Sequence, residues 1–218
     1  MPIISAFAII SILYFDRPIA EFFFELNSPS APIKPNLENL CLTKYNKATP
    51  EGLVAFIGVH ATNLCYVLIL PFFIMYFYLR LKQEKNYFNH FLGQFCKALV
   101  FAFFIKNTLK YVFGRTSPLL ENDRYLSFVA DPNSYYFHFF DITGDAASFP
   151  SGHMCIFSAL MLTTALYYKK LSPLCSLLTV CLFAGLLYFN LHYLSDLVVG
   201  TYLGISTALG LYLLDKTK

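Results

Sequence analysis

The sequence predicts an all-α membrane protein, a bundle of six transmembrane helices forming one domain over residues 1–218. Hydrophobic residues make up 57% of the 218 positions and charged residues only 13%, which is too apolar for a soluble domain of this length. The apolar residues also gather in long runs, each close to the ~20 residues needed to cross a bilayer. Tyrosine and phenylalanine concentrate near the ends of these runs, as is typical of membrane interfaces.

Six apolar runs define the expected spans. In chain order they are Pro2–Phe15, Leu53–Tyr78, Phe95–Phe113, Ser151–Tyr168, Pro173–Tyr188 and Leu194–Leu214. The first is short, and we expect a break at Asp16-Arg17-Pro18 with a re-entrant or interfacial stretch, Ile19–Leu26, behind it. A cleaved signal peptide is less favoured, because no basic residues precede this run and no small-residue cleavage site follows it.

The basic residues predict the orientation. Those beside the second-to-third connection, in the fourth-to-fifth turn and at the chain end all fall on one face, which the positive-inside rule makes cytoplasmic. They are Arg80, Lys82, Lys85, Lys97, Lys169, Lys170, Lys216 and Lys218. The segment Asp16–Gly52, the loop Gly114–Pro150 and the turn carrying His192 then face outward. A compact core without an appended domain indicates a bacterial plasma (inner) membrane protein with its site facing the periplasm or the outside.

Charge and cysteine content narrow the function classes. The net charge is only +3, and no basic stripe with interleaved aromatic residues indicates nucleic-acid binding. The cysteines lack the paired spacing of a metal site; five of the six lie within or beside apolar runs and fit small buried hydrophobic residues, whereas Cys41 lies in an outer loop. The six cysteines are Cys41, Cys65, Cys96, Cys155, Cys175 and Cys181. We expect no cofactor.

The first motif is Pro150-Ser151-Gly152-His153, at the start of the fourth run. Pro150 suits a helix beginning, and the N–H groups of the first helical turn favour an anion. Gly152 lets a phosphate approach the backbone, and His153 offers a proton. Alternatively, Ser151 simply caps the helix and His153 lies at the membrane interface.

The second motif is His192 with Asp196, four residues apart at the start of the last run. A carboxylate one turn away holds one ring nitrogen and leaves the other to attack phosphorus. This spacing is common by chance. However, Asp196 lies beside the apolar stretch Leu197-Val198-Val199-Gly200. Because an ionisable group is costly there, its presence favours a functional role.

Basic residues also mark the end of the third run. Lys106, Lys110 and Arg115 can hold phosphate oxygens, or can extend towards lipid headgroups. Whichever of the two lysines faces the bundle interior is the better candidate.

Together these motifs resemble those of the type 2 phosphatidic acid phosphatase (PAP2) superfamily. Its members share Lys-x6-Arg-Pro, Pro-Ser-Gly-His and Ser-Arg-x5-His-x3-Asp motifs on a six-helix membrane core; here the second is intact and the third retains its histidine and aspartate. The resemblance implies that His192 is a nucleophile forming a phosphohistidine, that Asp196 orients it and that His153 protonates the leaving oxygen. It further implies phosphate-binding roles for Lys110, Ser151 and Gly152, without a metal.

Two motif arginines are absent. Ser117 stands where the first motif has its arginine, and Gly185 and Leu186 stand where the third has Ser-Arg. We expect Arg115 to take over one phosphate-binding role. A further cation would come from Arg124, Lys106 or Lys44.

The sequence thus predicts a metal-independent phosphatase that cleaves a phosphomonoester or pyrophosphate of a lipid at the extracytoplasmic face, with Gly114–Pro150 as a substrate-facing flap. The resemblance suggests phosphatidate, phosphatidylglycerol phosphate, undecaprenyl pyrophosphate or lipid A phosphates as substrates. The alternatives are a lipid phosphotransferase, a noncatalytic lipid-phosphate-binding protein, or a small transporter. A transporter is less favoured because the sequence lacks paired interrupted helices.

Overall fold

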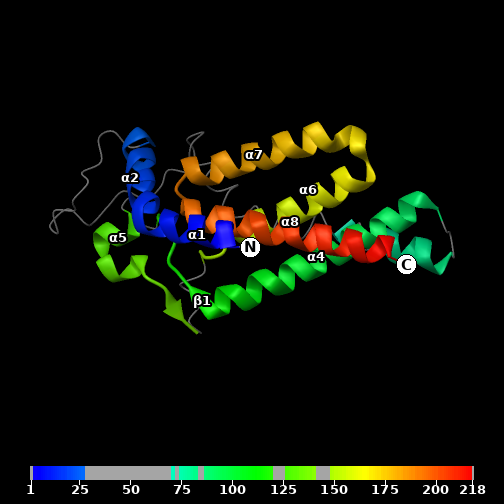
Figure 1. Cartoon of the computed structure of the whole chain (residues 1–218), viewed down its shortest axis with the longest axis horizontal. Helices are drawn as coiled ribbons and strands as arrows, with labels where there is room; N and C mark the ends of the chain where they lie inside the picture. The colour runs from blue at the N-terminus through cyan, green and yellow to red at the C-terminus, as the bar shows by residue number, and fades with distance from the viewer. Residues whose placement is uncertain are drawn as a thin grey trace.

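The computed structural model describes residues 2–27, 70–71, 74–82, 86–119, 126–140 and 148–217. Four helices form its centre: α4 (Tyr87–Val112), α6 (Gly152–Tyr167), α7 (Ser172–Tyr188) and α8 (Leu194–Lys216). Figure 1 shows α6 and α8 in the middle, with α4 along one side and α7 along the other. The predicted helical class is confirmed.

Three of the described helical segments are long and apolar enough to cross a membrane. They are Tyr87–Val112, Lys169–Tyr188 and Leu194–Lys216, and they match the third, fifth and sixth predicted runs. The fourth run forms α6, which is apolar but has only 16 residues. The second run lies mostly outside the described residues, although residues 74–81 are helical. The chain is an integral membrane protein.

The start of the third span was predicted too late. α4 begins at Tyr87 rather than Phe95, because Asn86 caps it: its side-chain oxygen accepts a hydrogen bond from the Asn89 amide at 2.7 Å. The extra two turns carry polar residues such as His90 and Gln94, which the hydropathy pattern excluded.

The predicted break at Asp16-Arg17-Pro18 was wrong. The chain stays helical through α1 (Pro2–Ile10), a π-helical segment η1 (Ser11–Phe15) and α2 (Asp16–Asn27). Pro18 lies in the first turn of α2, directly after the π-helical segment. The direction changes nonetheless, since α2 stands across the direction of α1 in Figure 1. A π-helical turn is a common cause of such a bend.

Glycines bring α8 against α6. A Cβ atom on Gly200 would lie 2.5 Å from the Ser151 carbonyl oxygen, and one on Gly204 would lie 2.3 Å from the Cys155 carbonyl oxygen. Both positions therefore require glycine for this close approach. Ser158 adds a hydrogen bond from its hydroxyl to the Thr201 carbonyl at 3.2 Å. The contact fixes the first turn of α6 beside the first turn of α8.

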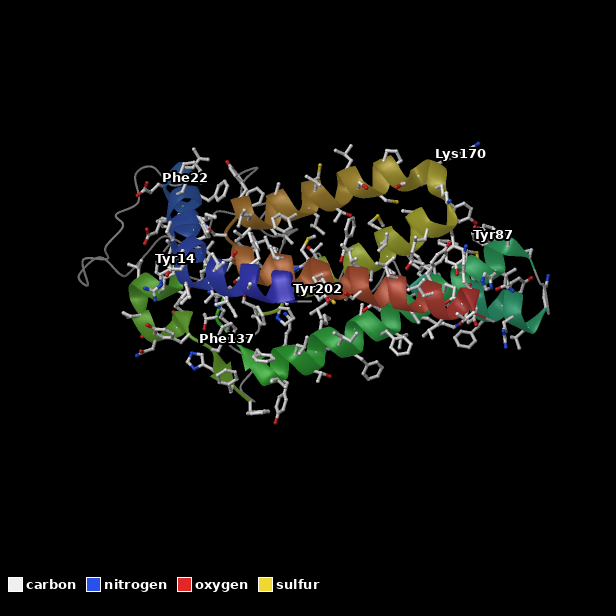
Figure 2. All side chains as sticks on the ribbon, viewed as in Figure 1. Tyr14, Phe22, Tyr87, Phe137, Lys170 and Tyr202 are labelled. Carbon is white, nitrogen blue, oxygen red and sulfur yellow. The ribbon has the colours of Figure 1, made fainter. Side chains whose placement is uncertain are left out.

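The segment after α4 covers one end of the bundle. It contains β1 (Phe113–Gly114), α5 (Ser127–Ala130), the 3-10 turn η3 (Pro132–Tyr135) and β2 (His138–Phe139). The two short strands pair antiparallel, with Phe113 opposite Phe139. Tyr135 packs in a buried cluster with Tyr193, at the start of α8. In Figure 2, Phe137 lies at this end of the bundle, whereas Tyr87 and Lys170 lie at the other.

Candidate active site

The turn between α7 and α8 positions His192. Asn190 ends α7 in the left-handed conformation (φ 53°), which asparagine tolerates better than most residues. Its side-chain amide donates to the Ala20 carbonyl at 3.1 Å, and its carbonyl accepts from the Leu119 amide at 3.2 Å. The turn is thereby fastened both to α2 and to the segment after α4, so His192 has a defined position.

The two candidate histidines meet. His153 Nδ1 lies 3.3 Å from His192 Nε2, although 39 residues separate them. The Ser151 amide donates to the Asp196 carbonyl at 3.0 Å and so joins the first turns of α6 and α8. His192 is buried, with 6% of its surface exposed, while His153 is half-buried. The structure thus brings the two sequence motifs into one site.

A serine links His192 to Asp196. Asp196 Oδ2 lies 3.7 Å from His192 Nδ1, which is too far for a hydrogen bond. Ser148 lies between them: its hydroxyl donates to Asp196 Oδ2 at 2.6 Å, and its oxygen lies 3.1 Å from His192 Nδ1. Because the single hydroxyl hydrogen is directed at the carboxylate, the oxygen accepts from Nδ1–H. This relay leaves Nε2 as the unprotonated nitrogen, facing His153.

Arg115 lies behind Asp196 rather than facing the histidine pair. It is fully buried, and its guanidinium donates to Asp196 Oδ1 at 3.0 Å, to Asp16 Oδ2 at 2.9 Å and to the Ser195 hydroxyl at 2.9 Å. The Cζ atom of its guanidinium lies 3.9 Å from the centre of the Tyr193 ring. The expected phosphate-binding role does not fit this geometry, since protein acceptors occupy its donors.

The buried groups around Asp196 also affect the protonation of Arg115 and His192. Burial opposes the charge of Arg115, but the carboxylates of Asp196 and Asp16 raise the pKa of its guanidinium above the usual value. Burial lowers the pKa of His192 below the ordinary histidine value of 6.5, although Asp196 opposes the shift. His192 is therefore neutral, as a nucleophile must be.

Lys106 and Lys110 converge on the first turn of α6. A Cβ atom on Gly152 would lie 3.0 Å from Lys106 Cδ, 3.5 Å from Lys106 Nζ and 3.5 Å from Lys110 Cε. Both lysines therefore reach the bundle interior at the start of α6. Lys106 is buried. Because Gly152 has no side chain, the Lys106 and Lys110 side chains can approach the start of α6.

Ser151 caps α6. Its hydroxyl accepts from the Met154 amide at 3.4 Å, and the residue is fully buried. The expected contact of Ser151 with phosphate would have to compete with this capping bond. By contrast, the amide of Gly152 belongs to the first helical turn, whose N–H groups have no acceptor within the helix.

Other sequence candidates fall elsewhere. Leu186 packs in the core against Met154 and Leu197, and Ser117 is partly buried. Arg124 and Lys44 lie outside the described residues, as do Cys41 and Cys65. Three of the four described cysteines are buried, but Cys181 is exposed. Among described residues, no group of three or more His, Cys, Asp or Glu side chains is arranged to hold a metal ion.

Sequence reasoning missed Ser148 and Asp16. Ser148 stands two residues before Pro150, and nothing in its local pattern distinguishes it from other loop serines. Asp16 had a weak signal as an acidic residue at the end of an apolar run. Its carboxylate accepts from both the amide and the hydroxyl of Ser195, at 2.9 and 2.5 Å. These bonds make Asp16 part of the support of the site.

A comparison with protein families agrees with the sequence resemblance. The family model described as the PAP2 superfamily matches residues 91–218. A solved structure, a transmembrane PAP2 type phosphatidylglycerolphosphate phosphatase from Bacillus subtilis, is 15% identical; the alignment covers 98% of this chain and 94% of that chain, with a TM-score of 0.49. No curated protein matches.

Proposed function

This chain belongs to the PAP2 superfamily, and from that premise we propose that it is a phosphatase acting on a membrane lipid, cleaving a phosphomonoester or pyrophosphate bond. The observation that carries the proposal is the 3.3 Å approach of His153 Nδ1 to His192 Nε2, backed by buried Asp196. Two imidazoles at one place, one of them held in a fixed tautomer, suit nucleophilic attack with proton transfer.

The proposed reaction has two steps. His192 Nε2 attacks phosphorus and forms a phosphorus–nitrogen bond, while the bond to the leaving oxygen breaks and His153, which enters the step as the imidazolium beside the bound phosphate, protonates that oxygen and becomes neutral. Water then attacks the phosphohistidine, His153 takes the water proton, and inorganic phosphate leaves with His192 restored. Ser148 and Asp196 hold Nδ1–H throughout and stabilise the positive charge that develops on the ring.

Substrate binding requires His153 to move. In an in-line displacement the nucleophile and the leaving oxygen lie on opposite sides of phosphorus, so the two ring nitrogens must be farther apart than 3.3 Å. His192 is buried and bonded to Ser148, whereas His153 is only half-buried. His153 is therefore the ring that rotates outward as the phosphoryl group enters.

Lys106, Lys110 and the first-turn amide of Gly152 form the proposed phosphate seat. Two lysines at one helix start supply positive charge beside the amide of Gly152. Lysine lacks the bidentate fork of arginine, so orientation depends more on the amide of Gly152. Arg115 is assigned a positioning role, because it holds Asp196 rather than substrate.

The substrate is proposed to enter from the bilayer, with its phosphate at the extracytoplasmic face. The basic residues at the opposite helix ends support this orientation. The candidates are phosphatidate, phosphatidylglycerol phosphate, undecaprenyl pyrophosphate and lipid A phosphates. The proposed location is a bacterial plasma membrane, and the proposed chemistry is metal-independent because protein cations supply the charge.

The test is release of inorganic phosphate from each lipid by purified protein in detergent with EDTA present. We expect turnover by the wild type, loss of at least about 10³-fold in kcat for His192→Ala, and a loss of about 10²-fold for Lys106→Met. His138→Ala is the matched control, because His138 lies exposed on β2. A His192→Ala variant as active as wild type would contradict the mechanism.

Two alternatives have their own signatures in the same experiment. Retention of a labelled lipid phosphate without turnover would indicate a noncatalytic binding protein on the same scaffold. A phosphorylated acceptor lipid in place of free phosphate would indicate phosphotransfer through the same phosphohistidine. The lowered pKa of His192 and the Ser148 bond favour catalysis over binding alone, because a binding site needs no defined imidazole tautomer.

A further inference from the structure

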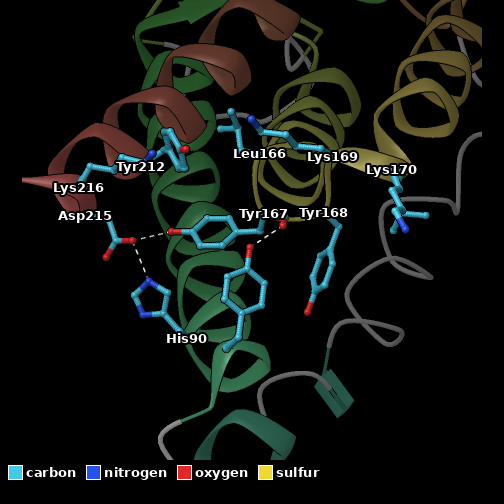
Figure 3. A pocket seen from close by; sticks show the side chains of 11 residues that line it. His90, Leu166, Tyr167, Tyr168, Lys169, Lys170, Tyr212, Asp215 and Lys216 are labelled. Carbon is cyan, nitrogen blue, oxygen red and sulfur yellow. Dashed lines mark hydrogen bonds and ion pairs between the residues drawn. The ribbon is translucent and has the colours of Figure 1, made fainter.

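The bundle end opposite the histidine pair carries an open cavity of about 830 Å³, shown in Figure 3. It is lined by the start of α4, the end of α6, the 3-10 turn η4 (Lys169–Leu171) and the end of α8. The mechanism proposed above uses none of its residues. Its lining combines lysines with four tyrosines, Tyr87, Tyr167, Tyr168 and Tyr212. Tyrosines of this kind lie at the headgroup level of a bilayer.

The carboxylate of the cavity is already engaged by the protein. Asp215 Oδ2 lies 2.8 Å from His90 Nε2 and accepts from the Tyr167 hydroxyl at 2.7 Å. Asp215 Oδ1 accepts from the Gln94 side chain at 2.6 Å. Figure 3 shows Asp215 turned towards His90 and Tyr167. The three lysines of the lining, Lys169, Lys170 and Lys216, outnumber this single carboxylate, so the cavity offers a net positive charge to a ligand.

Two lysines from different elements, Lys169 on η4 and Lys216 on α8, line this cavity. Lys216 Nζ lies 5.1 Å from the centre of the Tyr212 ring. In Figure 3, Lys169 extends over Leu166 on the side of the cavity where Tyr212 lies, whereas Lys170 extends away. Lys169 and Lys216 are both exposed. Two exposed ammonium groups lining one cavity offer hydrogen-bonding cations to a phosphate.

We propose that this cavity binds the phosphodiester headgroup of an anionic phospholipid, with Lys169 and Lys216 on the phosphate. The acyl chains of the lipid would lie against exposed leucines beside these lysines: Leu171, Leu213 and Leu214. Basic pockets between membrane helices are suited to such headgroups. A phosphodiester is not a substrate of the proposed phosphomonoesterase, so this site stands independently of the reaction at His192.

Native mass spectrometry of the purified full chain tests the proposal, using phosphatidylglycerol and zwitterionic phosphatidylcholine with identical chains. We expect preferential retention of phosphatidylglycerol, and about a fivefold loss in affinity for each lysine changed in Lys169→Gln and Lys216→Gln. Lys169→Arg with Lys216→Arg should retain the preference. Lys82→Gln is the matched control, because Lys82 Nζ lies 4.7 Å from the Tyr78 ring, outside the cavity.

Three results would overturn the proposal. Equal retention of the two lipids would exclude recognition of the anionic headgroup. An equal loss in Lys82→Gln would indicate a diffuse basic surface without a defined site. Displacement of phosphatidylglycerol by glycerol phosphate at the same concentration would indicate a site for a soluble phosphate in place of a lipid. All four variants alter exposed side chains, so we expect each to retain the fold.

Discussion

At the residue scale, Ser148 couples the carboxylate to the histidine. A hydroxyl that donates to Asp196 has only acceptor capacity left for His192, so it selects the Nδ1–H tautomer as a direct carboxylate contact would. It also lengthens the path between charge and ring, because Asp196 remains 3.7 Å from Nδ1. The orientation of His192 therefore depends on a neutral side chain from a different segment.

Ser148→Ala tests this dependence. The variant leaves Nδ1–H without its acceptor, and we expect kcat to fall about 10- to 100-fold, because a buried unsatisfied donor costs about 1–3 kcal/mol. Ser148→Thr keeps the hydroxyl and should retain most activity. The ¹⁵N spectrum of His192 provides a readout apart from turnover, since loss of the bond mixes the two tautomers. Unchanged kcat together with an unchanged ¹⁵N spectrum would remove Ser148 from the relay.

Arg115 illustrates why the sequence could identify the site residues but not all their roles. Its position after the third span suggested a cation for phosphate. The direction of its guanidinium is set by Asp16, 99 residues away, and by Asp196, 81 residues away. A buried arginine between two carboxylates is needed by both, because removing one partner leaves uncompensated buried charge. No local pattern contains that information, whereas the spacing of His192 and Asp196 is local and was visible.

At the element scale, the contact between α6 and α8 determines the distance between the histidines. His153 lies in the first turn of α6, and His192 lies just before α8, so any displacement of one helix along or away from the other changes the site. Gly200 lies against Ser151, beside His153. Small residues at such contacts are the usual means by which membrane helices approach closely.

Gly200→Ala is expected to separate the helix starts. The added methyl meets the Ser151 carbonyl oxygen, which cannot move as a flexible side chain would, so we expect destabilisation of about 1–3 kcal/mol and reduced phosphate release. Gly210→Ala is the control on the same helix, since a Cβ atom there meets nothing within 4 Å. It should retain activity and stability. Equal melting temperatures of the two variants in detergent would contradict the role of Gly200.

At the element scale, hydropathy predicts the starts of some helices and misses those of others. The spans that form α7 and α8 were predicted nearly to the residue at their starts, because Pro173 and the Leu194 boundary are marked in sequence. The first turns of α4 were missed because His90 and Gln94 are polar and form tertiary bonds to Asp215, at the other end of the chain. The helical continuation through Asp16 was missed as well. The ion pair with Arg115 offsets the cost of burying the Asp16 carboxylate, and the local sequence pattern does not reveal this pairing.

At the scale of the whole molecule, the bundle separates two polar regions. The histidine pair, its lysines and Arg115 lie where α4 ends and α6 and α8 begin, while Lys169, Lys216 and Asp215 lie at the opposite helix ends. Exposed apolar side chains such as Phe104, Leu177 and Val180 cover the helices between them. A membrane around this middle zone would leave each polar region at its own headgroup layer.

This burial of the site gives the whole protein a pH-dependent stability. Burial lowers the pKa of His192 below 6.5, so at lower pH the unfolded chain takes up a proton that the folded chain resists. The contribution of His192 therefore destabilises the fold progressively as pH falls below about 6.5 and vanishes above it. We expect the melting temperature in detergent to fall less between pH 7 and pH 5 for His192→Gln than for wild type. His138→Gln, at an exposed position on β2, should follow the wild type. Parallel curves for wild type and His192→Gln would mean that His192 protonates as readily in the folded chain as in the unfolded one.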